Sequence, residues 1–200
     1  MSVRRVRCSP GAHKLNRTEA FRDEPRCTVE DFLQWEGDWE LWRGTAVAMS
    51  PPPGVQHARV AGNLFYELQS QLEATGAGCR CEILAEMDRH VSDDEVLPPD
   101  LLIVCDPTQD RWVKKTPERV VEVVSPSSVR RDTIRKRGPS REAGVRSCVL
   151  ADPETRKLRC LHLDEDGEYV AGPPGFELHD GCRVRVDPER VWDGLADTAG

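Results

Sequence analysis

Two acidic residues in strand-like runs are the side chains of this sequence best placed to do chemistry. Asp100 opens the apolar run "DLLIVCD", and Glu122 lies in the middle of the valine-rich run "RVVEVVSPSS". β-Branched residues on both sides of Glu122 predict a strand that is buried on both faces. Burying an ionised carboxylate without a partner costs several kcal/mol or more, so a cation, a proton or a metal ion must compensate for it.

A divalent metal ion would use both acids at once. If the two strands pair, their carboxylates converge on one edge of the sheet. Hard ions such as Mg²⁺ take oxygen ligands and keep several waters, so two or three converging carboxylates suit them. Spacing alone leaves other interpretations open, because an aspartate at a strand start is often a turn residue and a strand glutamate often faces solvent.

The elements around these acids predict a mixed α/β domain. The segment "TVEDFLQWE" starts with a capping threonine and early acids, which favours a short helix. The segment "WELWRGTAVAMS" predicts two short strands about the Arg43–Gly44 turn. A longer helix is predicted from about Gln56, followed by glycines 76 and 78. Its apolar residues fall at helical spacing: Ala61, Leu64, Phe65, Leu68 and Leu72.

The rest of the chain is predicted to form mainly strands. We expect one strand in "CRCEILAEMDRHV", a loop in "SDDEVLPP", and strands in "DLLIVCD", in the valine run and in "SCVLADP". A polar segment from Ser128 to Ala143 separates the last two. The Asp166–Gly167 pair predicts a hairpin turn between "KLRCLHL" and "EYV".

Length and composition favour one globular domain. The chain has 200 residues with 38% apolar content, enough for a real core. We predict a domain over residues 26–193, a flexible extension over residues 1–25 and a tail over residues 194–200. No apolar run approaches the length of a membrane span, and the basic start lacks the hydrophobic segment of a signal peptide. We therefore expect a cytoplasmic protein with no membrane partner.

The eight cysteines are scattered along the chain, and we expect most of them to be small buried thiols. Cys79 and Cys81 form a C-x-C pair on a predicted strand, which points both side chains to one face. The sequence marks no second pair and no histidine cluster that would complete a zinc site.

Positive charge is concentrated in one segment. Residues 111–146 hold eleven lysines and arginines against four acids, a net charge of +7, although the whole chain carries −7. A basic segment on an acidic body fits a localised site for a polyanion such as DNA. A solvated charged face would give the same count.

Several motifs taken together resemble the Uma-two family of restriction-endonuclease type, in the PD-(D/E)XK nuclease superfamily. They are "PPDLLIV", "RVVEVVSPSS", Asp132 with Lys136, and "AGVRSCVLADPETRKL", in this order. Upstream, "WELWRGTAVAMSPPPGVQHARVAGNL" is similar to the beginning of the family's pattern. The resemblance runs from about Cys27 to about Trp192.

The resemblance implies a fold and a chemistry. The fold would be a restriction-endonuclease-like α/β core, with a mixed central β-sheet flanked by helices. The chemistry would be hydrolysis of DNA phosphodiester bonds with Mg²⁺ or Mn²⁺. Carried over by position, Asp100, Glu122 and Glu40 would be the metal ligands. The superfamily's lysine position is occupied by Val124, so Lys136 becomes the candidate for a migrated catalytic lysine.

One departure from the family pattern concerns Lys136. Pro139 follows it closely, and proline inside a helix costs roughly 3 kcal/mol and removes a backbone donor. We therefore predict that the helix bearing Lys136 is shortened or kinked.

Three classes of function follow. The first is a metal-dependent DNA endonuclease. The second is a nucleic-acid-binding or regulatory module of the same fold with impaired catalysis. The third is a protein-interaction scaffold in which Glu122 is neutralised by Arg119 or another cation. The sequence determines neither the target nor the oligomeric state, so a homodimer stays open. It also assigns no role to His57, which we expect to cap the helix or to pack in the core.

Overall fold

In the computed structural model, the described residues are 26–49, 54–76, 78–106, 110–124, 138–179 and 181–195. The chain divides into two compact units: unit 1 comprises Met1–Pro51 with Asp88–Pro98, and unit 2 comprises Pro52–Met87 with Pro99–Gly200. The extension predicted at residues 1–25 lies outside the described residues. The single domain proposed for residues 26–193 stays a prediction.

Unit 1 contains a short helix and a four-stranded sheet. The helix α1 (Val29–Phe32) starts at a capping box made by Thr28 and Asp31. The sheet has the order β2-β1-β5-β4, formed by β1 (Trp39–Trp42), β2 (Thr45–Ala48), β4 (Arg89–Ser92) and β5 (Glu95–Leu97). Strands β1 and β2 join through Arg43 and Gly44, which both have positive φ. The predicted helix and hairpin are confirmed.

Two sequence predictions in this region are wrong. The segment "CRCEILAEMDRHV" is not one strand but two, β3 (Cys81–Ala85) and β4, which belong to different sheets. The chain leaves extended geometry at Glu86, whose φ is +52°. The predicted loop "SDDEVLPP" contains β5, which pairs with both β1 and β4. A three-residue strand is too short to show a period in the sequence.

Unit 2 is built on a six-stranded mixed sheet of order β10-β9-β8-β7-β6-β3. Its further strands are β6 (Leu101–Cys105), β7 (Arg119–Val123), β8 (Ser147–Asp152), β9 (Lys157–Leu163) and β10 (Tyr169–Ala171). Strands β7 and β8 are parallel, and the other neighbours are antiparallel. The predicted mixed central sheet is confirmed, and so is the β9–β10 hairpin at Gly167.

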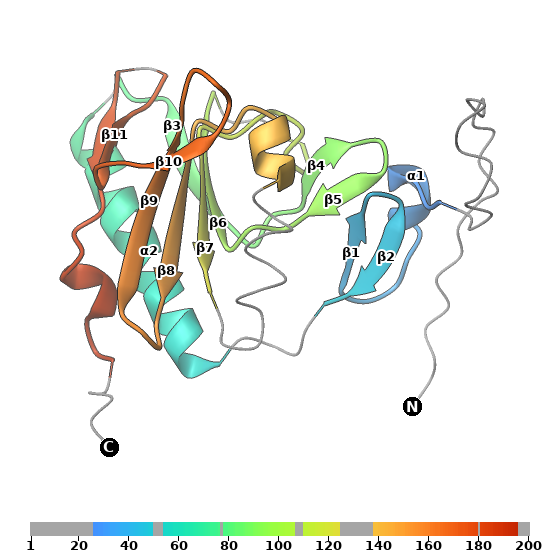
Figure 1. Ribbon diagram of the computed structural model, residues 1–200, viewed down its shortest axis with the longest axis horizontal. Helices are drawn as coiled ribbons and strands as arrows, with labels where there is room; N and C mark the ends of the chain where they lie inside the picture. Colours follow the sequence, from blue (N-terminus) through green and yellow to red (C-terminus); the bar gives the residue numbers. More distant parts are fainter. Residues whose placement is uncertain are drawn as a thin grey trace. The chain divides into compact units, whose positions relative to one another are not determined.

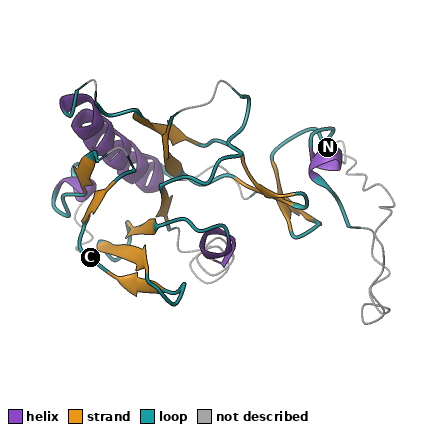
Figure 2. Cartoon of the chain, turned by 90° about the horizontal axis from the view of Figure 1, so that it is seen from above, coloured by secondary structure: helices purple, strands orange, loops and turns teal. Residues whose placement is uncertain are grey.

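The long helix α2 (Val55–Ala74) runs along one face of this sheet (Figure 1). Figure 2 shows the same helix beside the strands from above. Val60, Leu64, Leu68 and Leu72 form its buried stripe and pack in one cluster with residues of β3, β6, β7, β8 and β9. The predicted helical spacing is confirmed, and this cluster is the main core of unit 2.

The C-terminal part of unit 2 adds a separate hairpin, β11 (Gly175–Glu177) with β12 (Arg183–Arg185), and the short 3₁₀ helix η1 (Arg190–Trp192). Residues 138–142 are helical, and the carbonyl of Pro139 accepts the N–H of Ala143. Pro139 thus sits within a helical turn. Any break on the Lys136 side of it lies outside the described residues.

The expectation that most cysteines are buried thiols is wrong for the described residues, where Cys27, Cys79, Cys81, Cys105 and Cys182 are disulfide-bonded. Cys79 bonds to Cys182 and Cys81 to Cys105, with sequence separations of 103 and 24 residues. The fold brings together segments that are distant along the chain, which sequence spacing could not show. Cys148 and Cys160 are the buried thiols expected. Among the described helices, none is long and apolar enough to span a membrane.

Candidate active site

The strands that carry the two candidate acids are neighbours. Strand β6 pairs with β7 in antiparallel register, with Leu101 opposite Val121. Continued by one residue, this register places Asp100 opposite Glu122. Directly opposed residues of antiparallel strands have Cβ atoms roughly 4.5–5.5 Å apart. The pairing that the sequence left as a condition is thus present in the fold.

Asp100 is held on both its main chain and its side chain. Its backbone carbonyl accepts the N–H of Glu86, which follows β3, at 3.0 Å. Its Oδ2 accepts the N–H of Val123 at 2.6 Å. These contacts tie the residue before β6 to both neighbouring strands, so the carboxylate sits on a rigid part of the sheet.

A histidine from α2 joins Asp100. His57 Nε2 lies 3.3 Å from Oδ2 of Asp100, and both side chains are largely buried, with exposed fractions of 15% and 21%. The imidazole of His57 and the backbone N–H of Val123 therefore both contact Oδ2 of Asp100. Among the described residues, none donates to the other oxygen, Oδ1 of Asp100, which stays available to a ligand.

The environment of His57 favours its charged form. Burial lowers the pKa of His57, but the hydrogen bond and charge of Asp100, the charge of Glu122 and the backbone of Val123 raise it, and the pKa ends above its ordinary value. Both acids thus act on the imidazole of His57 in the same direction.

Glu122 alternates with two core residues of β7. Its neighbours Val121 and Val123 pack in the core under this helix, and side chains alternate along a strand. Glu122 is partly buried, and on the parallel neighbour β8 it stands opposite Leu150. Its side chain therefore leaves the backbone on the face opposite Val121 and Val123, at the end of β7 that adjoins Asp100.

Arg119 is not positioned to neutralise Glu122. It precedes Val121 by two residues and faces the core side of the sheet, where its guanidinium lies 4.7 Å from the centroid of the Phe176 ring. It donates to the carbonyls of Glu118 and Glu177. The scaffold hypothesis thus loses the specific cation that the sequence suggested for it.

The donor set fits a hard divalent ion that keeps most of its waters. Oδ1 of Asp100 and the carboxylate of Glu122 offer oxygen ligands from adjacent strands. Among the described residues, three carboxylate or histidine ligand atoms do not gather within 4.8 Å of one another. Mg²⁺ is commonly bound by only one or two carboxylates plus waters and substrate phosphate oxygens, so the pair is sufficient for such an ion.

The geometry of this pair does not bear on the other two predicted site residues. Glu40 lies on β1 in unit 1, opposite Val47 in the hairpin register. Lys136 lies outside the described residues. The metal-ligand role of Glu40 and the catalytic role of Lys136 stay predictions.

His57 is the residue that sequence reasoning missed. It precedes Val60 by three residues, Ala61 by four and Leu64 by seven, so it belongs to the apolar stripe of the predicted helix. That spacing was the available signal. It places the imidazole on the face that packs against the sheet, at the end where Asp100 precedes β6.

A mixed central sheet with a long helix on one face agrees with the α/β fold that the resemblance in sequence implied. Residues 29–182 match the model of the Uma2 family, described as "Putative restriction endonuclease". The chain belongs to this family, because the match covers more than half of its length.

One solved structure supports the fold independently. It is described as a putative nuclease belonging to DUF820 from Anabaena variabilis, and it is 13% identical to this chain with a TM-score of 0.65. The alignment covers 82% of this chain and 97% of that one. At this identity the likeness concerns the fold alone. No match was found among curated proteins.

Proposed function

We propose that this protein is an endonuclease that hydrolyses DNA phosphodiester bonds with Mg²⁺ or Mn²⁺ held by Asp100 and Glu122. The observation that carries the proposal is the opposition of these acids across β6 and β7, with Oδ1 of Asp100 free of donors among the described residues. The chain's membership of a family described as a restriction endonuclease also supports the proposal.

The ion would supply two effects when bound: polarisation of the phosphate and a lower pKa of a coordinated water. The chain supplies the positioning. Val123 and His57 fix Asp100 through Oδ2, so its second oxygen has a defined direction. Glu122 is fixed by the β7 ladder between β6 and β8. A carboxylate pair on adjacent strands is more rigid than one on loops, and this limits the reorganisation needed to reach the transition state.

Lys136 and Glu40 complete the proposal. The cation of Lys136 would orient the attacking water and stabilise the charge that develops on phosphorus oxygens. Glu40 would be a further acid for the ion. The basic segment 111–146 would contact the phosphate backbone, since Lys and Arg dominate such contacts.

A cleavage assay tests this function directly. Purified protein is incubated with supercoiled DNA in Mg²⁺, in Mn²⁺ and in chelator, alongside Asp100→Asn and Glu122→Gln. Glu177→Gln is the matched control, because this exposed acid pairs only with Arg183 on the β11–β12 hairpin. We expect cleavage by the parent and the control in metal, and none in chelator or by the two site variants.

Two results would contradict the proposal. Cleavage that persists in chelator, or equally in both site variants, would come from another site or from a contaminant. Tight binding of DNA without turnover in any metal would instead identify the non-catalytic nucleic-acid-binding module.

A further inference from the structure

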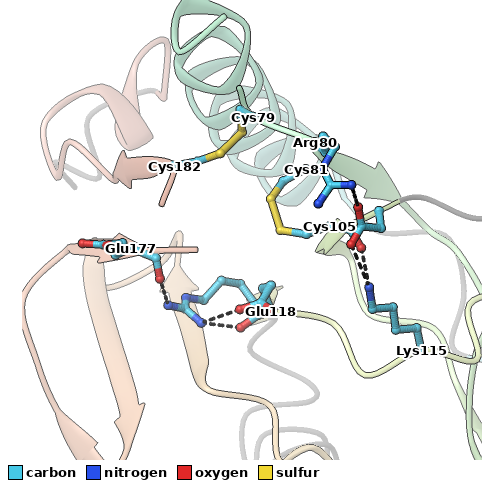
Figure 3. Close-up of a disulfide and its surroundings, with 10 residues drawn as sticks. Cys79, Arg80, Cys81, Cys105, Lys115, Glu118, Glu177 and Cys182 are labelled. Carbon is cyan, nitrogen blue, oxygen red and sulfur yellow. Dashed lines mark hydrogen bonds and ion pairs between the residues drawn. A yellow bond between two sulfur atoms is a disulfide. The ribbon is translucent and has the colours of Figure 1, made fainter. Parts of the chain in front are cut away.

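Four cysteines of unit 2 converge on one point of its main core. Cys79 lies in the short link between α2 and β3, and Cys81 starts β3. Cys105 ends β6 directly opposite Cys81, and Cys182 lies in the turn between β11 and β12. Figure 3 shows the two resulting disulfides side by side, Cys79–Cys182 and Cys81–Cys105.

The two pairs are much closer than two independent cross-links need to be. The sulfur atoms of Cys79, Cys81 and Cys182 all lie within 4.8 Å of one another, although they belong to different pairs. The fourth sulfur, from Cys105, is bonded to Cys81. Three clustered sulfurs, with the fourth bonded to one of them, supply the four donors of a tetrahedral soft-metal site.

We propose that, in the reduced protein, Cys79, Cys81, Cys105 and Cys182 bind one structural zinc ion through four thiolates. Zinc–sulfur bonds of about 2.3 Å in a tetrahedron set the sulfurs roughly 3.8 Å apart. The sulfurs of Cys79, Cys81 and Cys182 already lie within 4.8 Å of one another, and Cys105 would turn its sulfur from Cys81 toward the shared ion. This site is independent of the carboxylates proposed for phosphodiester hydrolysis.

The local charges suit a zinc–thiolate group. One Zn²⁺ with four thiolates carries a net charge of −2. Arg80 stands between the two cysteines of the C-x-C pair, and the Nζ atom of Lys115 donates to the carbonyl of Cys105 at 2.8 Å. Both cations also contact Asp106, at 2.9 Å and 3.7 Å (Figure 3). Arg80 and Lys115 are thus neighbours of Cys81 and Cys105, and positive charge near a thiol favours its thiolate.

Burial closes the site on the core side. Cys105 and Cys182 are 2% and 1% exposed and belong to the main core cluster, and Cys79 and Cys81 pack against it. Closed sites with four cysteine ligands are typical of structural rather than catalytic zinc. The β11–β12 hairpin pairs only within itself among the described strands, so the ion would anchor it to β3 and β6.

The conversion of the two disulfides into four zinc-bound thiolates balances in electrons and protons. Each disulfide takes two electrons and two protons from one molecule of a dithiol reductant, which is oxidised to its own disulfide. Four thiols result from the two bonds. Zinc binding then displaces the four thiol protons to solvent as four zinc–sulfur bonds form.

The test begins with the full chain produced in zinc-containing medium and purified in reductant without chelator. Metal analysis of the parent should give one zinc per chain. Replacement by Co²⁺ should give the strong visible absorption of tetrahedral cobalt–thiolate coordination, which is distinct from the weak absorption of cobalt on carboxylates and water. The cobalt spectrum needs no variant, so it does not depend on how any substitution folds.

Variants then assign the ligands. Cys79→Ser and Cys81→Ser replace the two half-buried members and should lose the zinc, with folding checked by circular dichroism. Cys160→Ser is the matched control, because this thiol lies in the same core but outside the cluster. Glu122→Gln should also keep its zinc, so loss of nuclease activity and loss of zinc are separable results.

Three results would overturn the proposal. Reduced parent protein that holds no zinc above a chelator-treated control would mean that the four cysteines serve as two disulfides. Zinc that persists in both Cys79→Ser and Cys81→Ser would place the ion elsewhere. Cobalt that shows only six-coordinate oxygen absorption would do the same.

Discussion

Nε2 of His57 lies 3.3 Å from Oδ2 of Asp100, the same oxygen that accepts the N–H of Val123. Two donors on one oxygen fix the orientation of the carboxylate and leave Oδ1 as its ligand atom. His57 is therefore a positioning residue for the proposed metal site, and it acts through Asp100.

His57→Ala should weaken the response to Mg²⁺. Loss of a group that orients a metal ligand typically costs 10–100-fold in metal affinity or activity, so we expect the Mg²⁺ concentration for half-maximal cleavage to rise by about this factor. His57→Gln keeps an N–H donor near the same place and should recover part of the loss. A Mg²⁺ titration of cleavage for all three proteins measures this. Identical titrations for parent and His57→Ala, with thermal stability changed, would make His57 only a core residue.

Arg119 should contribute to stability and not to metal binding. Burial lowers the pKa of Arg119 to about 10, against the opposing charge of Glu118. Its guanidinium donates to two carbonyls and packs on the Phe176 ring. Arg119→Ala leaves an acceptor without its donor and removes this packing, so we expect a loss of about 1–3 kcal/mol in the free energy of unfolding.

The stabilisation of Arg119→Ala by Mg²⁺ should match that of the parent, because Arg119 faces the opposite side of the sheet from Glu122. Denaturant unfolding with and without Mg²⁺ gives both quantities. If Arg119→Ala also abolished the stabilisation by Mg²⁺, Arg119 would contribute to the metal site although it faces the other side of the sheet.

Glu67 should make stability depend on pH. This α2 residue is 4% exposed; its Oε1 accepts the N–H of Asp187 at 2.6 Å, and its Oε2 is buried with no partner among the described residues. Burial raises the pKa of Glu67 above its ordinary value of 4.5. Between the ordinary pKa of the unfolded state and the raised pKa of the folded state, the folded protein binds more protons. Stability therefore falls as pH rises through this window.

Glu67→Gln keeps a side-chain oxygen that can accept the N–H of Asp187, and its amide does not ionise. At neutral pH we expect the Gln variant, in metal-free buffer, to unfold at the same or a higher denaturant concentration than the parent. Its advantage should disappear as the pH falls toward 4.5 and the parent carboxyl takes up its proton. Glu73→Gln, at an exposed position of the same helix, controls for loss of one negative charge. An advantage that grew at low pH would reverse the sign and refute the assignment.

The elements that carry the site were predictable because their signals are local. The apolar stripe of α2 and the valine run of β7 each follow from residues within one element. The pairing of β6 with β7 and the position of β5 depend on contacts between segments distant in sequence, and "SDDEVLPP" carries no period that would reveal a three-residue strand. The approach of His57 to Asp100 and of Cys182 to Cys79 belongs to the same class. Such contacts are properties of the packed chain, and only the folded structure brings them into view.

Glu122 gives the most decisive prediction. If a metal ion is what compensates this carboxylate, then without the ion the two opposed acids repel each other and destabilise the fold. Glu122→Gln should therefore be at least as stable as the parent in metal-free buffer, lose the parent's stabilisation by Mg²⁺, and lose cleavage by several orders of magnitude. A glutamate that is ion-paired with a buried cation predicts the opposite, since its neutralisation strands that cation and costs about 3–5 kcal/mol. Thermal melts of parent, Glu122→Gln and the control Glu177→Gln, each with and without Mg²⁺, separate these cases. Strong destabilisation of the metal-free Glu122→Gln protein together with an unchanged shift on adding Mg²⁺ would show that Glu122 belongs to a structural ion pair.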